Sequence, residues 1–256
     1  MTHQLVPEVH ISSPAAPAPV SPKGQATYSH AHWYFAAALA AIVSGFWPSF
    51  FRTLGASDVS HSIHGITATL WVVALMVQSF LMSRGLVTWH RRVAVGALLL
   101  LPVLIVSAMQ MVAVMFANQQ MPPFLPPLLA FIDLPSLAVL VMLVILALTN
   151  IRKPAAHKRF MAATVLLGLP PALTRLYARV FAPHIDFMQA LHASFFTVEL
   201  VLIALIVSDW RAGERRLAYP LSLAFFVTVH ASMETAATSA RWLAAMNSYT
   251  ALPLFQ

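Results

Sequence analysis

The segment PPLLAFIDLPSLAVLVMLVILALT, residues 126–149, decides the fold class of this chain. A transmembrane helix needs about 20 consecutive, mostly apolar residues to cross the hydrocarbon of a bilayer. The segment meets that length, and Asp133 is its one ionisable residue. It therefore predicts a membrane-spanning helix that carries a carboxyl group at a depth where lipid disfavours charge.

Further apolar runs of similar length lie on both sides of this segment. Together they predict an all-α, polytopic transmembrane helix bundle of about seven spans, in a single domain over residues 29–256. Residues 1–28 are rich in Pro, Ala and Ser and lack the apolar core of a signal peptide, so we expect a disordered tail there. The other expected spans are 33–51, 64–83, 93–117, 158–180, 188–208 and 217–242.

The composition agrees with a membrane protein and excludes several other classes. Only 9% of the residues are charged and 59% are hydrophobic, whereas a soluble domain carries about 25% charged residues. The absence of cysteine excludes disulfides, thiolate metal sites and cysteine nucleophiles. The net charge of +7 comes from short basic clusters between apolar runs, a pattern that orients helices and does not indicate nucleic-acid binding.

The basic clusters predict the orientation of the chain. Lys and Arg gather in every second loop, and the positive-inside rule places such loops in the cytoplasm. We therefore expect a bacterial inner-membrane protein, embedded in the lipid bilayer, with a cytoplasmic N-terminus and an outer C-terminus. The clusters are Arg84, Arg91 and Arg92; then Arg152, Lys153, Lys158 and Arg159; and finally Arg211, Arg215 and Arg216.

A short motif occurs twice and suggests an internal repeat of a helix hairpin. His90-Arg91-Arg92 leads into LLLLP, which ends at Pro102, and His157-Lys158-Arg159 leads into LLGLP, which ends at Pro170. A duplication would explain this, but so would chance, because Leu and basic flanks recur in all membrane proteins.

Histidines and acids inside the apolar runs are the candidate functional residues, because ionisable groups at membrane depth are costly. Most of them converge on the outer half of the expected bundle, where Glu199 follows His192 by two turns and Glu234 follows His230 by one turn. His90 and His157 form a separate pair at the inner edge. The remaining outer candidates are His61, His64 and Asp133.

One chemistry that suits these residues is b-type haem. A low-spin haem needs two neutral imidazoles on facing helices, one on each side of the iron. His64 and His192 would form the outer pair, and His90 and His157 the inner pair. Two stacked haems would carry electrons through the membrane, with a membrane redox partner or quinone as the expected partner.

Part of the sequence resembles the cytochrome b561 type. Ile63-His64-Gly65, Trp71, Arg84 and Trp89-His90 are similar to that family's IHG…W…R…W…H pattern, over about two spans. The resemblance implies four helices that hold two haems between two histidine pairs. The HxxHG…HRR…HKR arrangement also resembles a broad group of bacterial multi-pass membrane proteins, which implies a topology but no activity.

A metal site is the first alternative. Nitrogen and oxygen ligands suit zinc, iron or manganese. The chain resembles membrane hydrolases of the alkaline ceramidase and adiponectin-receptor type, which implies a zinc-bound water that cleaves an amide. That family has two histidines four apart on its last span, where this chain has His230 and Glu234; Glu234 or Glu199 would then be the catalytic base. The candidate ligands are His61, His64, His192, His230, Glu234 and Asp133.

A third class needs no cofactor. Buried His, Glu and Arg can form a proton or solute path in a transporter, or hold helices together in a sensor or an assembly subunit. The chain has no phosphate loop and no nucleophile elbow, and its last apolar run has no lysine for a retinal Schiff base. Whether the protein is an enzyme stays open at this point.

Overall fold

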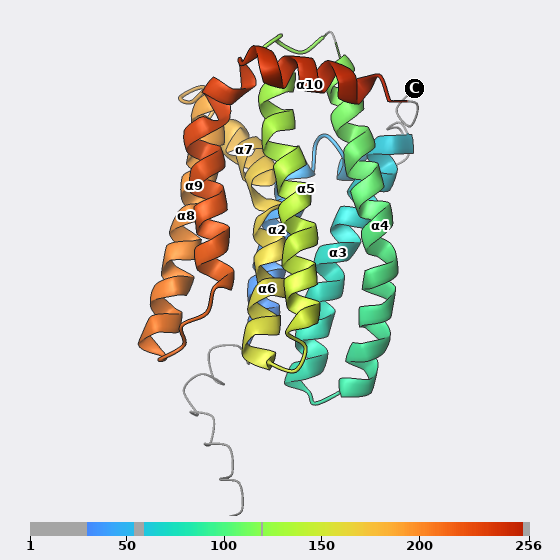
Figure 1. Ribbon diagram of the computed structural model, residues 1–256, viewed down its shortest axis with the longest axis vertical. Coiled ribbons are helices and arrows are strands. Elements are labelled where there is room, and N and C mark those ends of the chain that lie inside the picture. The colour runs from blue at the N-terminus through green and yellow to red at the C-terminus, as the bar shows by residue number, and fades with distance from the viewer. Residues whose placement is uncertain (1–29, 54–58, 119, 253–256) are drawn as a thin grey trace, which may run out of the picture.

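A computed structural model describes residues 30–53, 59–118 and 120–252, and every regular element within them is a helix (Figure 1). The tail expected over residues 1–28 lies outside the described residues. The elements are α2 (Ala31–Phe46), η1 (Phe51–Thr53), α3 (Val59–Ser83), α4 (Val87–Ala117), α5 (Leu125–Thr149), α6 (Pro154–Leu166), α7 (Leu169–Val180), α8 (Phe187–Arg211), α9 (Ala218–Ala237) and α10 (Ala240–Thr250).

The long helices make this a multi-pass membrane bundle. Five helical segments are long and apolar enough to cross a bilayer: α3, α4, α5, α8, and α6 together with α7. Of the other two expected spans, α2 is apolar but has only 16 residues. Helix α9 has 20 residues, but its polar side chains make it less apolar than the five helical segments that can cross a bilayer. The all-helical architecture with several helices able to cross a membrane is confirmed, and the count of seven spans is not, because α2 and α9 fall short of the other five.

The last expected span, 217–242, is too long. The structure ends α9 at Ala237 and starts α10 at Ala240. Ser239 separates them with an extended backbone, and its Oγ accepts a hydrogen bond from the backbone N–H of Trp242 at 3.2 Å. Serine favours this N-cap position, so a new helix begins there. Trp242 therefore lies on α10, which crosses the ends of α4, α5 and α9 (Figure 1).

The expected span 158–180 is interrupted near its middle. Helix α6 ends at Leu166, and α7 starts at Leu169 with Gly168 as its N-cap and prolines in its first turn. Proline has no N–H and suits a first turn, where backbone N–H groups have no helical partner. Helix α4 continues without a break through Pro102. The two copies of the repeated motif therefore have different backbone shapes.

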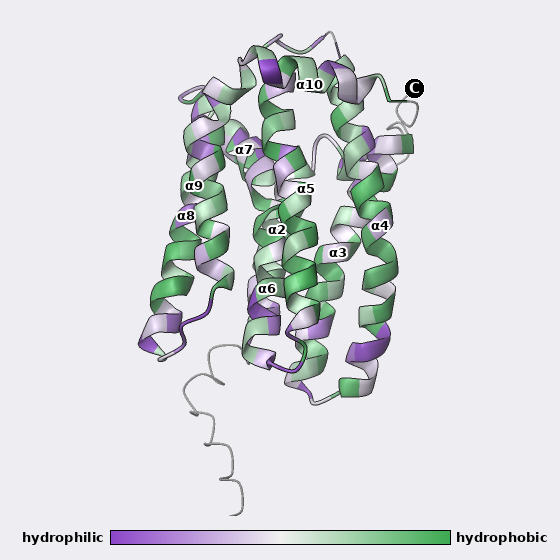
Figure 2. Cartoon of the chain, viewed as in Figure 1, coloured by the Kyte–Doolittle hydropathy of each residue, from purple (hydrophilic) through white to green (hydrophobic). Residues whose placement is uncertain are grey.

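The two ends of the bundle differ in polarity. The three basic loops, α3–α4, α5–α6 and α8–α9, lie at one end, which we call the basic end, and α10 lies across the other, which we call the α10 end (Figure 1). Figure 2 shows hydrophilic residues gathered at the basic end and a mostly apolar band between the ends. This alternation of loops agrees with the pattern expected from the positive charges.

Close helix packing fixes the centre of the bundle. A core of buried residues from α5 to α9 surrounds Phe195, Leu202 and Phe226. Helix α2 packs on α7 at Gly45, where an added Cβ would collide with the backbone of Ala172. Small residues allow helix backbones in membranes to approach in this way. The packing places α8 between α7 and α9, with its polar face against α9.

Candidate functional site

The site is built on the antiparallel pair α8 and α9. Helix α8 starts at Asp186, whose side chain accepts a hydrogen bond from Gln189 N at 2.8 Å, while Asp186 N donates to Gln189 Oε1 at 2.9 Å. This capping box fixes the register of α8. At the other end, Gly213 has φ +76°, a left-handed conformation that glycine adopts without strain, and it turns the chain back into α9.

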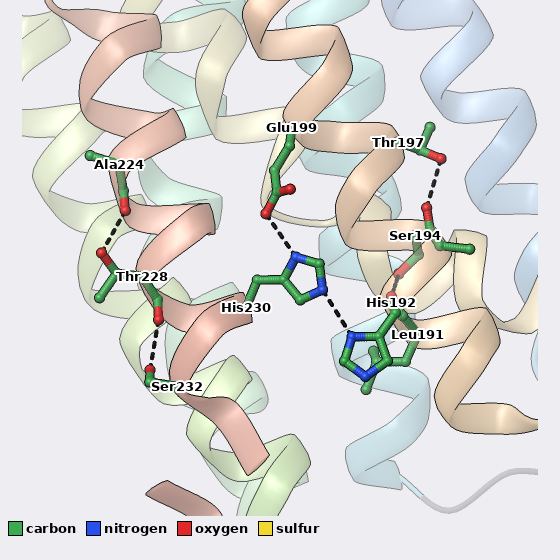
Figure 3. Close-up of polar contacts among 10 residues, drawn as sticks. Leu191, His192, Ser194, Thr197, Glu199, Ala224, Thr228, His230 and Ser232 are labelled. Atoms are coloured by element: carbon green, nitrogen blue, oxygen red, sulfur yellow. Dashed lines mark hydrogen bonds and ion pairs between the residues drawn. The ribbon is translucent and has the colours of Figure 1, made fainter. Parts of the chain in front are cut away.

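Four ionisable side chains from these two helices form one continuous hydrogen-bonded chain. His192 Nε2 lies 2.8 Å from Glu234 Oε1, and His192 Nδ1 lies 2.9 Å from His230 Nε2. His230 Nδ1 lies 2.9 Å from Glu199 Oε1. Figure 3 shows the two imidazoles pointing toward each other, with Glu199 beyond His230. We call Glu234, His192, His230 and Glu199 the His–Glu chain.

The His–Glu chain runs from an exposed end to a buried end. The Glu234 side chain is 60% exposed and that of His192 is 35% exposed. The exposed fraction falls to 10% for His230 and 12% for Glu199. The rings of Phe195 and Phe196 pack on His230, with centroid distances of 4.9 and 4.7 Å. The Glu234 end therefore lies on the surface of the bundle, while the rings of Phe195 and Phe196 pack on the His230 end.

The number of protons in the His–Glu chain determines which proton transfers are possible along it. Three hydrogen bonds join the four groups and need three protons. Two neutral imidazoles supply one N–H each. The third proton must sit on a carboxyl group or turn one imidazole into a cation. In either case the two carboxylates contribute two negative charges and the third proton contributes one positive charge. The His–Glu chain therefore has a net charge of −1.

Two arrangements that keep both imidazoles neutral satisfy every bond. In the first, the Glu234 carboxyl O–H donates to His192 Nε2, His192 Nδ1–H donates to His230 Nε2, and His230 Nδ1–H donates to the Glu199 carboxylate. In the second, all three bonds run in the opposite direction. Passing one proton along each bond converts one arrangement into the other. The result is the transfer of a proton between Glu234 and Glu199, for which histidine is well suited.

The outer histidines of α3 lie apart from the His–Glu chain. Helix α3 packs mainly on α4 and α2, whereas α8 packs on α7 and α9. His192 has both ring nitrogens hydrogen-bonded to α9 side chains. His64 is not among its partners, and His64 Nδ1 is buried without a hydrogen bond. The structure thus does not join His64 to His192 as the outer pair expected from the sequence.

The inner histidines, His90 on α4 and His157 on α6, both lie on the parts of their helices at the basic end. His157 Nδ1 lies 2.9 Å from the carbonyl oxygen of Ala147, so that nitrogen carries the proton and Nε2 is the free one. His90 is close enough to His157 for the two rings to interact electrostatically. Its Nδ1 is buried without a hydrogen-bond partner. The pairing of His90 with His157 around a haem stays a prediction.

Asp133 belongs to neither group. It interacts electrostatically with Arg175 of α7. The Arg175 guanidinium lies over the Phe46 ring at 4.6 Å and donates to the Pro171 carbonyl at 2.9 Å. Among the described residues, no group of three or more His, Asp or Glu side chains is arranged to hold a metal ion. The six candidate ligands therefore do not gather around one point in the described part of the chain.

One buried charge pair was missed in the sequence. Arg159 of α6 donates from Nε and Nη2 to the two carboxylate oxygens of Asp209 on α8, at 2.6 and 2.7 Å. The two residues are only 1% and 4% exposed. From the sequence, Arg159 is interpreted only as an orienting charge, and Asp209 is not singled out. The signal was an acid in the last turn of an apolar helix, where the helix dipole disfavours negative charge.

Comparison with known proteins adds no family assignment. No family model, curated protein or solved structure matches this chain. The resemblances to cytochromes of the b561 type and to membrane hydrolases stay predictions. The function is therefore argued from the geometry of the side chains.

Proposed function

We propose that this integral membrane protein translocates protons, and that the His–Glu chain is the part of the path nearest the α10 end. The observation that carries the proposal is the unbroken series of three hydrogen bonds between four titratable groups. Each bond is short enough for proton transfer without an intervening water. The positive-inside pattern supports a cytoplasmic basic end, and with it we propose a bacterial inner membrane and a cytoplasmic N-terminus.

The exposed fractions of the four side chains indicate which end of the His–Glu chain exchanges protons with the surface. Glu234 and His192 reach the surface, where water supplies or removes protons. Glu199 lies in the interior on α8, ten positions before Asp209. At the helical rise of 1.5 Å per residue, these two carboxylates are about 15 Å apart along the axis. Tyr219 and Ser222 are buried in the part of α9 nearer the basic end.

A purely structural role accounts less well for this composition. Helices in membranes are held together by small residues and by neutral hydroxyl or amide hydrogen bonds, such as the Thr174–Ser194 and Tyr177–Thr197 contacts between α7 and α8. Two histidines and two glutamates at one contact cost more and need an extra proton. A function in proton transfer explains why two histidines and two glutamates lie at one helix contact.

The test is proton flux in proteoliposomes. The purified protein is reconstituted with a pH-sensitive dye inside the vesicles, a pH gradient is imposed, and the membrane potential is clamped with valinomycin and potassium. We expect flux above that of empty vesicles. His230→Ala removes the centre of the relay and is expected to lower the flux by about 100-fold or more. His184→Ala, in the exposed α7–α8 loop, is the matched control and leaves the flux unchanged. Flux equal to empty vesicles overturns the proposal.

A second candidate function is electron transfer through a b-type haem at the basic end. His157 Nδ1 is held by the Ala147 carbonyl, the kind of hydrogen bond that orients a ligating histidine and leaves Nε2 for the iron. His90, with its unpartnered Nδ1, would supply the opposite imidazole. Such a haem would supply one-electron chemistry, with a quinone or a membrane redox protein as partner.

An absorption spectrum tests this second candidate. Protein purified from cells grown with ample haem precursor is measured oxidised and then reduced with dithionite. A Soret band, with α and β bands that sharpen on reduction, supports the haem, and His90→Ala or His157→Ala should then remove it. A flat visible spectrum excludes the haem, and it leaves the proton proposal untouched.

A further inference from the structure

A hollow at the basic end lies where α8 turns into α9. It has a volume of about 500 Å³ and is lined by Trp210, Arg215, Arg216, Leu217 and Pro220. The loop folds back tightly here, because Glu214 N donates to the Asp209 carbonyl at 2.9 Å and Gly213 adopts its left-handed conformation. This fold brings two consecutive arginines to the start of α9.

The charge in this hollow is incompletely neutralised. Arg215 is exposed and makes no hydrogen bond or ion pair with any residue in the described part of the chain. Arg216 Nε donates to Glu214 Oε2 at 2.9 Å. A guanidinium has five N–H donors, so Arg216 keeps donors to spare and Arg215 keeps all of its own. The hollow therefore suits an anionic group with several acceptor oxygens.

The remaining walls of the hollow are apolar. Trp210 is 63% exposed and Leu217 is 75% exposed. Further along the two helices, toward the apolar band, Ile203 and Leu221 are also exposed. Figure 2 shows that the α8–α9 loop lies at the basic end, next to the apolar band, and loops that flank apolar helices in this way lie near lipid headgroups. A ligand that satisfies both the arginines and the apolar walls must carry an anionic head and a hydrocarbon tail.

We propose that the α8–α9 hollow binds an anionic phospholipid, with Arg215 contacting the phosphate and the acyl chain lying along the exposed side chains of α8 and α9. Basic pockets between transmembrane helices on the cytoplasmic side bind acidic lipid headgroups by the same chemistry. Trp210 is suited to the glycerol level, because an indole has an apolar body and one N–H donor. The inference is independent of proton translocation, since the hollow shares no residue with the His–Glu chain.

Native mass spectrometry of the detergent-purified protein tests the proposal. The protein is titrated with phosphatidylglycerol, with phosphatidylcholine and with glycerol phosphate, and the retained molecules are counted. We expect phosphatidylglycerol to bind more tightly than phosphatidylcholine. Each basic residue near a membrane surface contributes about 1 kcal/mol, so Arg215→Gln should weaken phosphatidylglycerol binding by about fivefold. Arg215→Lys keeps the charge and should recover most of the affinity.

The matched control is Arg152→Gln. Arg152 is also exposed at the basic end but lies in the α5–α6 loop, away from the hollow, so its loss should leave binding unchanged. Three results would overturn the proposal: equal retention of the two lipids, equal effects of the two Gln substitutions, or binding of glycerol phosphate as tight as that of the lipid. The last result would identify a soluble phosphate site.

Discussion

His192 and His230 are 38 residues apart in sequence, yet Nδ1 of the first lies 2.9 Å from Nε2 of the second. Two neutral imidazoles can share this bond only if one donates and the other accepts. Each ring also uses its second nitrogen on a glutamate. The bond between the histidines therefore links the protonation of Glu234 to that of Glu199, only one of which carries the proton at a time.

The two glutamates are predicted to differ in importance. Glu199→Gln keeps an oxygen that can accept from His230 Nδ1, but an amide cannot take up the proton, so flux should fall by about 100-fold. Glu234→Gln acts at the exposed end, where water can deliver protons directly to His192, and should lower flux by less than about tenfold. Proton flux in proteoliposomes measures both. Equal loss in the two variants would contradict the exposure gradient.

The buried Arg159–Asp209 pair is predicted to stabilise the fold only while both partners are present. Asp209→Asn leaves the guanidinium buried and uncompensated, which costs about 3–5 kcal/mol. The double variant Arg159→Met with Asp209→Leu removes both charges and should recover most of that loss. Unfolding of the detergent-solubilised protein, followed by circular dichroism, measures the difference. The prediction fails if Asp209→Asn unfolds like the wild type.

The contact between α2 and α7 is predicted to be intolerant of a methyl group. Gly45→Ala places a Cβ against the Ala172 backbone, and such overpacking costs about 1–3 kcal/mol. Gly96→Ala is the control, because nothing lies within 4 Å of its added Cβ. Alanine is the better helix former, so Gly96→Ala should be neutral or stabilising by up to about 1 kcal/mol. The same unfolding assay should rank the two variants in this order.

The Glu214–Arg216 pair outside the membrane is predicted to depend on pH. The hydrogen bond from Arg216, then its positive charge and those of Arg159 and Lys158, lower the pKa of Glu214. A lowered folded-state pKa contributes stability that is present above the ordinary glutamate pKa and is lost as pH falls through the lowered value. The pair is partly exposed, so the contribution is below about 1 kcal/mol.

Comparison of the wild type with Glu214→Gln measures this contribution. The difference in unfolding free energy should be constant at neutral pH and should shrink toward zero in acid. A difference that grows in acid would show that the carboxylate is not the form that Arg216 stabilises.

The bundle architecture could be predicted because length and apolarity alone identify segments such as 126–149. Helix ends were less predictable. The break after Ala237 depends on Ser239 acting as a cap, and Ser and Thr also occur inside α9, where their hydroxyls donate to backbone carbonyls of the preceding turn, as Thr228 and Ser232 do. Local sequence does not distinguish these two uses of a hydroxyl.

The members of the His–Glu chain were each identifiable as ionisable residues in apolar runs. Their grouping could not be predicted. The sequence indicates how deep a residue lies along its helix, but tertiary packing determines which helices contact each other. His64 and His192 were expected as partners at equal depth, yet α3 packs on α2 and α4, and α8 packs on α9. The register of Glu199 with His192, and of Glu234 with His230, did follow from helical spacing.

The most direct test of proton translocation is chemical rescue of His230→Ala. Proton flux is measured in proteoliposomes that contain the wild type or this variant, before and after free imidazole is added. If His230 passes protons between His192 and Glu199, flux is lost in the variant and imidazole restores part of it, while the wild type does not change. If the variant conducts protons as well as the wild type without imidazole, the His–Glu chain is not the proton path.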